Sequence, residues 1–239
     1  MTDPLPISGY VLAGGRSSRM GADKALLPLA GKPLIEHAVT KLRRICSDVH
    51  ILSSNSALVP YAPLIPDTHP GCGPIGGMEA ALTHTRHDWN LFLPVDLPFL
   101  PTAYLDQWVR GIVNRRATRI RVALFSVFGI PQPTLLIIHR DAAPCIARAV
   151  AQGEFKLFPV LETAARELAL PDARPQEQVP TMLPIDEHFH FEGWRQPHPG
   201  PSWQVLTEAQ RAAQPLWFAN LNTPEDFAIA EANIAALDT

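Results

Sequence analysis

The chain has 239 residues, 46% of them hydrophobic, and a formal net charge of −3. This length accommodates one large α/β domain with a full core. The slight excess of acidic residues excludes non-specific nucleic-acid binding, which needs clustered excess cations, so any negatively charged ligand must be held by local groups.

The cysteine content and the first residues indicate a cytoplasmic protein. Cys46, Cys72 and Cys145 are too few and too scattered for a disulfide framework or a tetrahedral zinc site, which favours a reducing compartment. The first residues lack the charged and apolar regions of a signal peptide, and no apolar run approaches the roughly 20 residues that span a bilayer. We therefore expect neither export nor a membrane partner.

The first predicted element is a buried parallel strand over residues 7–13, because its apolar residues are continuous and end at glycine. Residues 12–24 then contain three glycines and three cations. Glycine lets backbone N–H groups approach phosphate oxygens, and arginine and lysine neutralise phosphate charge. The spacing G-G-x-x-x-R-M-G-x-x-K fits neither the P-loop nor the dinucleotide fingerprint G-x-G-x-x-G. The sequence predicts a nucleotide-binding loop of another kind.

The next elements are a helix and a second strand. The helix is predicted to start at Pro33 and to bury one apolar face, with Lys41 near its C-terminal end, where a cation suits the helix dipole. The strand, residues 49–52, leads into a polar loop at the edge where α/β sheets bind ligands. Ser53 or Asn55 is expected to contact a base or ribose there, and an ordinary polar turn is the alternative.

Residues 90–100 form a second strong motif. Their apolar strand ends on Asp96, and Pro98 forces the chain to leave the sheet. Asp96 is therefore expected to point from the C-terminal edge of the sheet, where phosphates should lie. Proteins bind Mg²⁺ through one or two carboxylates plus substrate phosphates, so this single aspartate suffices as a magnesium ligand. A turn or helix-capping aspartate is the alternative.

The middle of the chain contains further helices and strands. The spacing predicts a helix from Thr102, a second that begins at its cap Asp141 and ends at Gln152, and a third over residues 157–168. Between the first two lie two predicted strands and the turn that joins them, at residues 120–128, 133–138 and 129–132.

The C-terminal part departs from this regular pattern. Residues 170–215 contain eight prolines and no hydrophobic period, which indicates a Pro-rich insertion, functional or mobile, within a single domain of residues 1–239. Residues 216–219 are a predicted last buried strand. Thr223, followed by proline and two acidic residues, is a strong N-cap for a closing helix through residues 227–237.

These motifs resemble the nucleotidyltransferases, and most closely the molybdenum cofactor guanylyltransferases. The likeness rests on L-A-G-G-x-x-x-R-M-G-x-x-K-x-L-L-x-L-x-G-K-P-L at residues 12–34, on D…G-P-x-x-G from Asp67, on P-x-D-x-P-F-L around Asp96 and on N-x-N-T-P-E-D at residues 220–226. It implies an α/β fold: a single Rossmann-like, three-layer nucleotidyltransferase domain with a predominantly parallel mixed sheet.

The resemblance also implies roles for individual residues. Those expected to bind the nucleotide are Leu12, Ala13, Gly14, Gly15, Lys24, Ser53, Asp67 and Asp96. Asp67 would read guanine, because a carboxylate accepts from both the N1–H and the exocyclic amine, a geometry that cytosine does not offer. The expected catalytic residues are Arg19, which shapes the phosphate loop, Lys24, which neutralises charge on the α-phosphate, and Asp96, which binds Mg²⁺.

Three residues are implied to contact the acceptor. Asn220 and Asn222 belong to the asparagine-rich turn that borders the acceptor site in the family. Lys156 stands where the family usually has a G-x-R-R-V run, so a bidentate guanidinium has become a point charge. A second departure is Ser53, since related enzymes often carry an asparagine at or near that position.

The function implied by the resemblance is transfer of GMP from GTP to the phosphate of molybdopterin carrying molybdenum, which gives the molybdopterin guanine dinucleotide cofactor and pyrophosphate. The substrates are GTP and molybdenum-loaded molybdopterin, and molybdoenzyme chaperones or other cofactor-assembly proteins are the suggested protein partners. The acceptor phosphate is already ionised at neutral pH, so positioning and charge neutralisation suffice for catalysis.

Three alternatives stay open. A molybdopterin cytidylyltransferase resembles these enzymes but usually has L-A-A-G where this chain has L-A-G-G. A sugar-1-phosphate nucleotidyltransferase shares the G-G-x-x-x-R-M…K pattern. A non-catalytic GTP-binding partner protein is the alternative outside the enzymes, in which the departures at Ser53 and Lys156 and the long insertion have removed activity.

Overall fold

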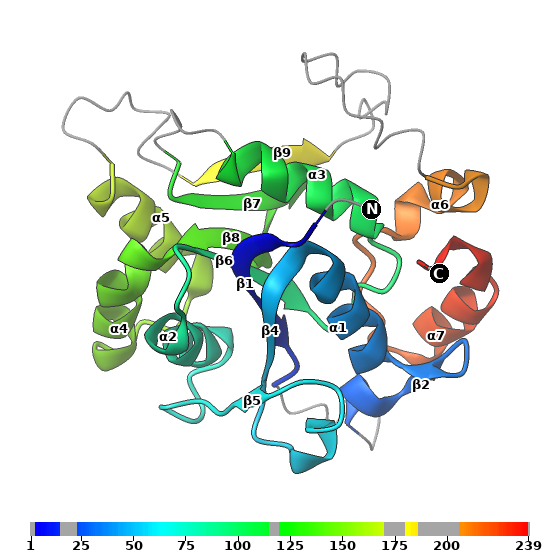
Figure 1. Cartoon of the computed structure of the whole chain (residues 1–239), viewed down its shortest axis with the longest axis horizontal. Helices are drawn as coiled ribbons and strands as arrows, with labels where there is room; N and C mark the ends of the chain where they lie inside the picture. Colours follow the sequence, from blue (N-terminus) through cyan, green and yellow to red (C-terminus); the bar gives the residue numbers. More distant parts are fainter. Residues whose placement is uncertain (1–2, 15–22, 115–119, 170–179, 186–205, 239) are drawn as a thin grey trace.

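The computed structural model describes residues 3–14, 23–114, 120–169, 180–185 and 206–238, with the backbone alone at 181–185. Its centre is a seven-stranded sheet in the order β5-β4-β1-β6-β8-β7-β9 (Figure 1). The strands are β1 (Leu5–Leu12), β4 (Cys46–Leu52), β5 (Leu64–Ile65), β6 (Trp89–Pro94), β7 (Val122–Val127), β8 (Ile130–His139) and β9 (Thr181–Ile185). Among these strands β8 runs antiparallel to both neighbours and every other pair is parallel, which confirms the predicted mixed sheet.

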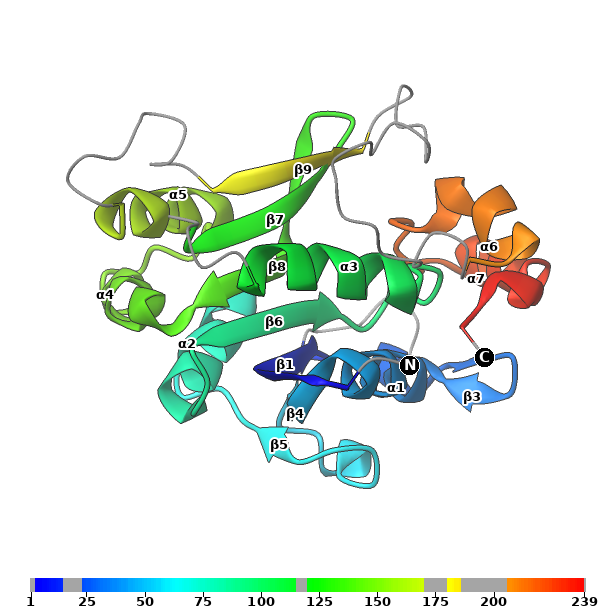
Figure 2. The same cartoon turned by 45° about the horizontal axis from the view of Figure 1, so that its top comes forward.

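Helices cover both faces of the sheet and complete three layers (Figures 1 and 2). One core packs against α1 (Leu34–Ile45), α3 (Thr102–Val113), α6 (Glu208–Ala212) and α7 (Pro224–Glu231). The other packs against α2 (Pro74–His84), α4 (Ala143–Ala151) and α5 (Leu157–Glu167). Because side chains alternate along a strand, Ile7 and Val11 of β1 lie in the first core and Tyr10 lies in the second. A small hairpin of β2 (Pro28–Leu29) and β3 (Lys32–Pro33) precedes α1.

Lys41 on α1 does not serve the helix end as expected, because its side chain is buried. Its amine donates to Asp238 Oδ2 at 2.6 Å and to the carbonyl oxygen of Leu100. Asp238 also accepts hydrogen bonds from the backbone N–H and the hydroxyl of Thr102. Burial opposes ionisation of Asp238, but the charge of Lys41 and these hydrogen bonds outweigh it and hold the pKa of Asp238 below its ordinary value. The ion pair therefore ties the end of the described chain to α1 and α3.

The turn between β7 and β8 is tighter than predicted. Val127 pairs directly with Ile130, so the turn consists of Phe128 and Gly129, and residues 130–132 belong to β8 instead. Both turn residues have positive φ, 48° and 76°, as a two-residue turn of type I′ requires. The right-handed twist of the paired strands selects this turn, and glycine adopts the second position without strain.

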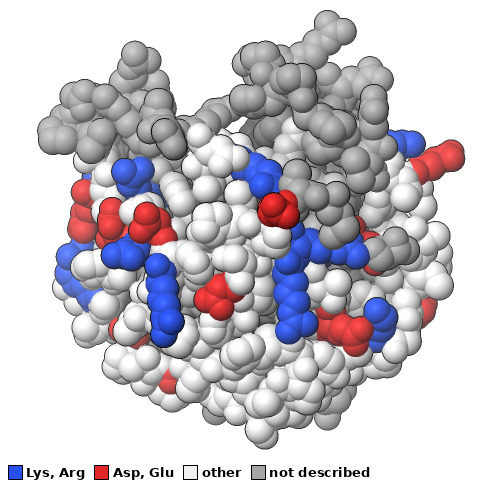
Figure 3. Space-filling model, viewed as in Figure 1, with Lys and Arg blue, Asp and Glu red and all other residues white. Residues whose placement is uncertain are grey.

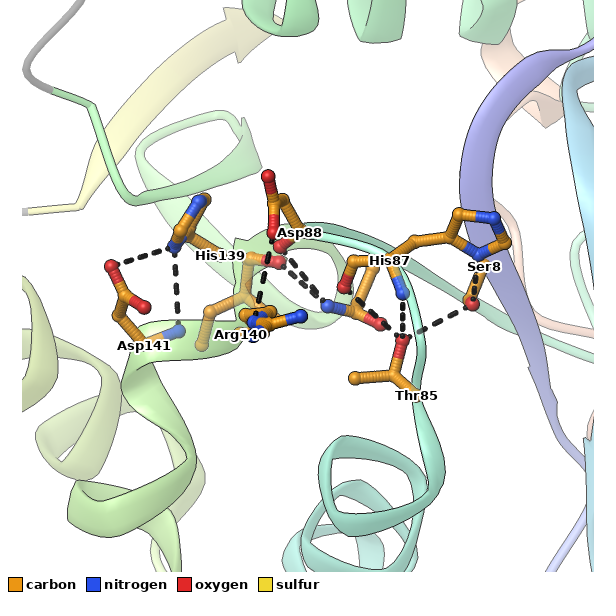
Figure 4. A network of polar contacts seen from close by, with 9 residues as sticks. Ser8, Thr85, His87, Asp88, His139, Arg140 and Asp141 are labelled. Carbon is orange, nitrogen blue, oxygen red and sulfur yellow. Dashed lines mark hydrogen bonds and ion pairs between the residues drawn. The ribbon is translucent and has the colours of Figure 1, made fainter.

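The segment after β8 also differs from the prediction, because Asp141 does not begin the helix. A short 3₁₀ helix (Arg140–Ala142) precedes α4, and its N-cap is His139. The backbone N–H of Arg140 donates to Asp88 O at 2.7 Å and fastens this corner to β6. Figure 4 shows His139 facing Asp141 and the Arg140 side chain facing Asp88. The predicted C-terminal end of α4 is confirmed, with Gln152 as C-cap and Gly153 at a φ of 76°.

The C-terminal part differs from the prediction in one element, the strand over residues 216–219. The described residues within 170–215 include two regular elements: β9 pairs parallel with β7, and α6 starts at a complete capping box. Proline is tolerated in β9 because this strand is at the sheet edge. Residues 216–219 form no strand: a 3₁₀ helix (Gln214–Leu216) leads into Trp217, whose buried indole donates to Gln210 O at 2.9 Å. Thr223 caps α7 as predicted, although α7 is shorter than expected.

Two further observations concern membrane-spanning helices and the distribution of surface charge. No helix among the residues that the structure describes is both long and apolar enough to cross a bilayer. Figure 3 shows acidic and basic side chains interspersed on the described part of one face.

We expect Lys41→Met to lower the free energy of unfolding by about 3 kcal/mol, because the buried Asp238 carboxylate would lose its counter-ion. Lys32→Met is the matched control, since Lys32 pairs with Glu36 at 3.2 Å on the exposed surface and such pairs contribute less than about 0.5 kcal/mol. Urea denaturation of both variants measures the difference. Equal losses would contradict a buried ion pair at Asp238.

A second prediction concerns His139. Burial lowers the pKa of His139 below its ordinary value, although the Asp141 carboxylate acts in the opposite sense. The unfolded chain therefore takes up this proton first, and stability falls as the pH drops below about 6.5 toward the folded pKa. Between pH 7.5 and 5.5 the free energy of unfolding should fall more in wild type than in His139→Asn, by up to about 1 kcal/mol. Chemical denaturation at the two pH values measures this difference. Parallel losses in the two proteins would argue against this assignment.

Candidate active site

Four parallel strands end at the same level, and this places the residues that follow them side by side. Leu12 at the end of β1 pairs with Leu52 of β4 and with Pro94 of β6, and Leu52 pairs with Ile65 of β5. The carboxyl ends of parallel strands are where α/β folds bind ligands. The predicted site residues after each strand therefore gather at one edge of the sheet.

A cavity of about 280 Å³ opens at this edge. It is lined by Ala13, Gly14, Asp23, Ser53, Ser54, Asn55 and Asp67. Four of these were predicted to bind a nucleotide, namely Ala13, Gly14, Ser53 and Asp67. Leu12 does not line the cavity, and its carbonyl oxygen instead accepts from the Val95 backbone N–H at 3.2 Å.

In the loop after β4, Ser53 and Asn55 are joined by a hydrogen bond. Ser53 is buried and its hydroxyl oxygen accepts from the Asn55 backbone N–H at 3.1 Å. The Asn55 side chain accepts from the Ala57 N–H at 3.0 Å, and its amide nitrogen donates to Asp23 Oδ2 at 2.5 Å. Both residues line the cavity, so both remain candidates for contact with a base or ribose.

Asp23 is a site residue that the sequence analysis did not single out. Its Oδ1 accepts from the Ala25 N–H at 2.9 Å and caps the short 3₁₀ helix η1 (Lys24–Leu26), while its Oδ2 bonds Asn55. This carboxylate thus connects the cavity wall to the residue next to it, Lys24. The available signal was an aspartate directly before a short helical run, which is a favoured N-cap.

Asp67 lines the cavity and lies close to the glycine-rich start of α2. Burial raises the pKa of the Asp67 carboxyl above its ordinary value. A Cβ at Gly77 would lie 3.4 Å from Asp67 Oδ1, and a Cβ at Gly76 would lie 3.1 Å from the His69 carbonyl oxygen. These two glycines therefore let the first turn of α2 approach the Asp67 segment closely.

Lys24 and Asp96, two of the three residues expected to be catalytic, meet directly. The Lys24 amine lies 2.5 Å from Asp96 Oδ2, and only 14% and 17% of the two side chains are exposed. Two backbone hydrogen bonds hold the Asp96 segment in place: Val95 N–H donates to Leu12 O, and Leu221 N–H donates to Asp96 O at 3.3 Å. The Lys24 amine and the Asp96 carboxylate therefore lie side by side at this edge of the sheet, as the proposed roles require.

The asparagine-rich turn before α7 supplies a third group. Asn222 Oδ1 accepts from the Lys24 amine at 2.6 Å, so the amine lies between an amide oxygen and a carboxylate oxygen. The backbone N–H groups of Asn222 and Thr223 both donate to Asp226 Oδ2. These two hydrogen bonds hold the pKa of Asp226 below its ordinary value. Asp226 is the second residue that the sequence analysis did not assign to the site.

Comparison with known proteins identifies the family. A model described as the MobA-like NTP transferase domain matches residues 9–167. The chain belongs to this family. The match contains the cavity, Lys24 and Asp96, whereas the turn with Asn222 lies beyond it.

Curated relatives of this MobA-like transferase include molybdenum cofactor guanylyltransferases. That of Serratia proteamaculans is 35% identical over 170 residues, covering 68% of this chain and 83% of the relative. That of Yersinia pestis is 34% identical over 162 residues, covering 66% of this chain and 80% of the relative. The solved molybdopterin-guanine dinucleotide biosynthesis protein A of Archaeoglobus fulgidus has a TM-score of 0.65 at 22% identity, covering 96% of this chain and 100% of that one. This likeness supports the Rossmann-like fold.

For four predicted site residues of this transferase, the described structure gives no contact with Lys24 or Asp96. Gly15 and Arg19 lie outside the described residues. Lys156 is exposed at the N-cap of α5, on the opposite face of the sheet from α7. Asn220 is exposed, and within the part of the chain described its neighbour Leu221 makes the contact to Asp96. The roles of Gly15 and Arg19 at the nucleotide, and of Lys156 and Asn220 at the acceptor, stay predictions.

Proposed function

We propose that this nucleotidyltransferase transfers GMP from GTP to the phosphate of molybdopterin carrying molybdenum, with release of pyrophosphate. The main support is the meeting of the Lys24 amine and the Asp96 carboxylate beside a polar cavity, in a chain whose curated relatives are molybdenum cofactor guanylyltransferases. The cytidylyltransferase and sugar-1-phosphate alternatives receive no better support from these relatives. The curated relatives, which are named as guanylyltransferases, favour an enzyme over a non-catalytic binding protein.

The reaction requires positioning more than covalent help from the protein. An oxygen of the acceptor phosphate attacks the α-phosphorus of GTP, a new phosphorus–oxygen bond forms, and the bond to pyrophosphate breaks. Because the attacking oxygen is already ionised, no general base is needed. The Lys24 amine stabilises negative charge that develops on the α-phosphate, an effect that is strong where water is partly excluded.

The cavity suits the guanine base better than the phosphates. Among its described lining residues two are carboxylates, Asp23 and Asp67, and none is a lysine or arginine. Asp23 already accepts two hydrogen bonds, which leaves Asp67 to accept from the N1–H and the exocyclic amine of guanine. The phosphates then lie toward Lys24, which is next to Asp23 in the chain.

We also propose that Asp96 holds Mg²⁺ together with the substrate phosphates. Asp96 Oδ1 is buried and has no hydrogen-bond partner in the described structure, and a carboxylate oxygen is the type of ligand that Mg²⁺ prefers. No cluster of three or more histidine, cysteine, aspartate or glutamate side chains among the described residues offers a preformed metal site, so phosphates must complete the coordination. Bound there, the ion would neutralise charge on the phosphate oxygens.

The product is a cofactor that must pass to a molybdoenzyme. We therefore propose as protein partners the chaperone of that enzyme or other cofactor-assembly proteins. The proposed place of action is the cytoplasm, as the cysteine content indicates.

The decisive experiment incubates the protein with Mg²⁺, molybdenum-loaded molybdopterin and an equimolar mixture of GTP and CTP. The expected result is the guanine dinucleotide, detected by mass spectrometry, with stoichiometric pyrophosphate. A cytosine dinucleotide would identify a cytidylyltransferase instead. Tight Mg·GTP binding with no product would indicate a non-catalytic binding protein.

We expect Asp67→Asn to weaken GTP binding about tenfold, because the ionised carboxylate accepts two hydrogen bonds from guanine and charge-assisted bonds are strong. Since burial raises the pKa of Asp67, wild-type affinity should also fall as the pH is lowered from 7.5 to 5, and it should fall more than that of the variant, in which only the nucleotide phosphate still takes up a proton. Calorimetric titration with GTP and ITP measures both effects, since ITP lacks the exocyclic amine. An unchanged GTP to ITP preference in the variant would refute the assignment.

We expect Lys24→Ala to lower kcat by about 10² to 10³-fold, because one preorganised charge is lost from the transition state. The protein should stay folded at the assay temperature, because the backbone hydrogen bonds from Val95 to Leu12 and from Leu221 to Asp96 do not involve Lys24. Lys32→Ala, an exposed lysine of the β2–β3 hairpin, is the control and should keep full activity. Pyrophosphate release and thermal denaturation measure the two quantities, and a Lys24→Ala protein with undiminished kcat would exclude this role.

A further inference from the structure

The position of Asn222 is set by the backbone on either side of it and not by packing of its own side chain. Its side chain is exposed, so no core contact fixes where the amide oxygen lies. The turn is held on both sides instead: Leu221 N–H donates to Asp96 O, and the N–H groups of Asn222 and Thr223 donate to Asp226 Oδ2 at 2.7 and 2.8 Å.

Asp226 makes one hydrogen bond more than a helix cap requires. In a capping box the residue at the third helical position accepts from the N-cap N–H, here that of Thr223, and the Thr223 hydroxyl accepts from Asp226 N–H at 3.2 Å. The additional bond reaches one residue further back, to the N–H of Asn222. Asn222 is the residue whose Oδ1 accepts from the Lys24 amine at 2.6 Å.

We propose that Asp226 is a positioning residue of the transferase: it fixes the Asn222 backbone, so that the Asn222 amide oxygen holds the Lys24 amine at the phosphate site. The inference rests on the proposed function for its effect on turnover. Two hydrogen bonds lead from Asp226 through Asn222 to Lys24, and a substitution at Asp226 removes the first of them without changing a residue of the proposed substrate site.

Neighbouring residues provide matched controls. Thr223→Ala removes the hydroxyl that caps the Asp226 N–H but leaves the Asp226 carboxylate bonded to both N–H groups. It weakens the same helix start without releasing Asn222. Glu225→Ala removes an acidic side chain from the same first turn of α7. Asp226→Asn keeps an acceptor oxygen and removes the charge.

We expect Asp226→Ala to lower kcat about tenfold with the KM for GTP within twofold of wild type, because the effect acts on the Lys24 amine in the transition state. The kcat of Asp226→Asn should lie within about threefold of the wild-type value, since the amide oxygen of asparagine can accept hydrogen bonds from both N–H groups. Thr223→Ala and Glu225→Ala should keep the wild-type kcat, although Thr223→Ala lowers the melting temperature as much as Asp226→Ala does. Wild-type kcat in Asp226→Ala, or an equal loss in Thr223→Ala, would overturn the proposal.

A readout without substrate separates this inference from the proposed function. Acetylation by an N-hydroxysuccinimide ester at pH 8.5, followed by peptide mass spectrometry, reports how firmly each amine is held, with exposed Lys32 as internal reference. We expect Lys24 to react several-fold faster in Asp226→Ala than in wild type and at the wild-type rate in Thr223→Ala. Unchanged Lys24 labelling in Asp226→Ala refutes the positioning role, whereas a wild type that labels as expected but forms no dinucleotide refutes the proposed function alone.

Discussion

The ion pair between Lys24 and Asp96 depends on the register of the parallel sheet. The two residues are 72 positions apart in the sequence. They meet because Leu12 of β1 pairs with Pro94 of β6, so that both strands end at the same edge of the sheet. The short helix η1, capped by Asp23, then turns the Lys24 side chain back toward the edge. A different register would separate the amine from the carboxylate, and the contact between these opposite charges at the sheet edge would be lost.

The same edge is completed by a segment from the other end of the chain. Residues 206–238 lie beyond the family match, yet Leu206, Trp217 and Leu221 belong to the same core as α1 and α3. The buried pair of Lys41 and Asp238 anchors the end of this segment, and Leu221 bonds the backbone of Asp96. The position of Asn222 beside Lys24 therefore depends on packing far from the site as well as on its own turn.

Much of the fold follows from local signals in the sequence. The apolar run of β1, the apolar face of α1 and the Thr223 cap of α7 are each decided within a few residues, and all three are where the sequence predicted them. The predictions from sequence are wrong where contacts with distant parts of the chain override the local preference. Residues 216–219 have strand-like apolarity, but Trp217 reaches the Gln210 carbonyl and packs against Tyr104, so the segment remains a turn. The β7–β8 turn is two residues long because strand pairing continues to Ile130.

The candidate site divides in the same way. By itself the sequence determined which residues can act, because a glycine-rich loop with cations, an aspartate after a buried strand and an asparagine before a capped helix are chemical types at fixed local spacing. Only the tertiary structure decided which of them touch: Lys24 meets Asp96 and Asn222, Asp23 joins the cavity through Asn55, and Lys156 stays on the other face. The physical reason is that hydrogen bonds and ion pairs act over a few ångströms in space, and strand register and core packing determine which distant residues come that close.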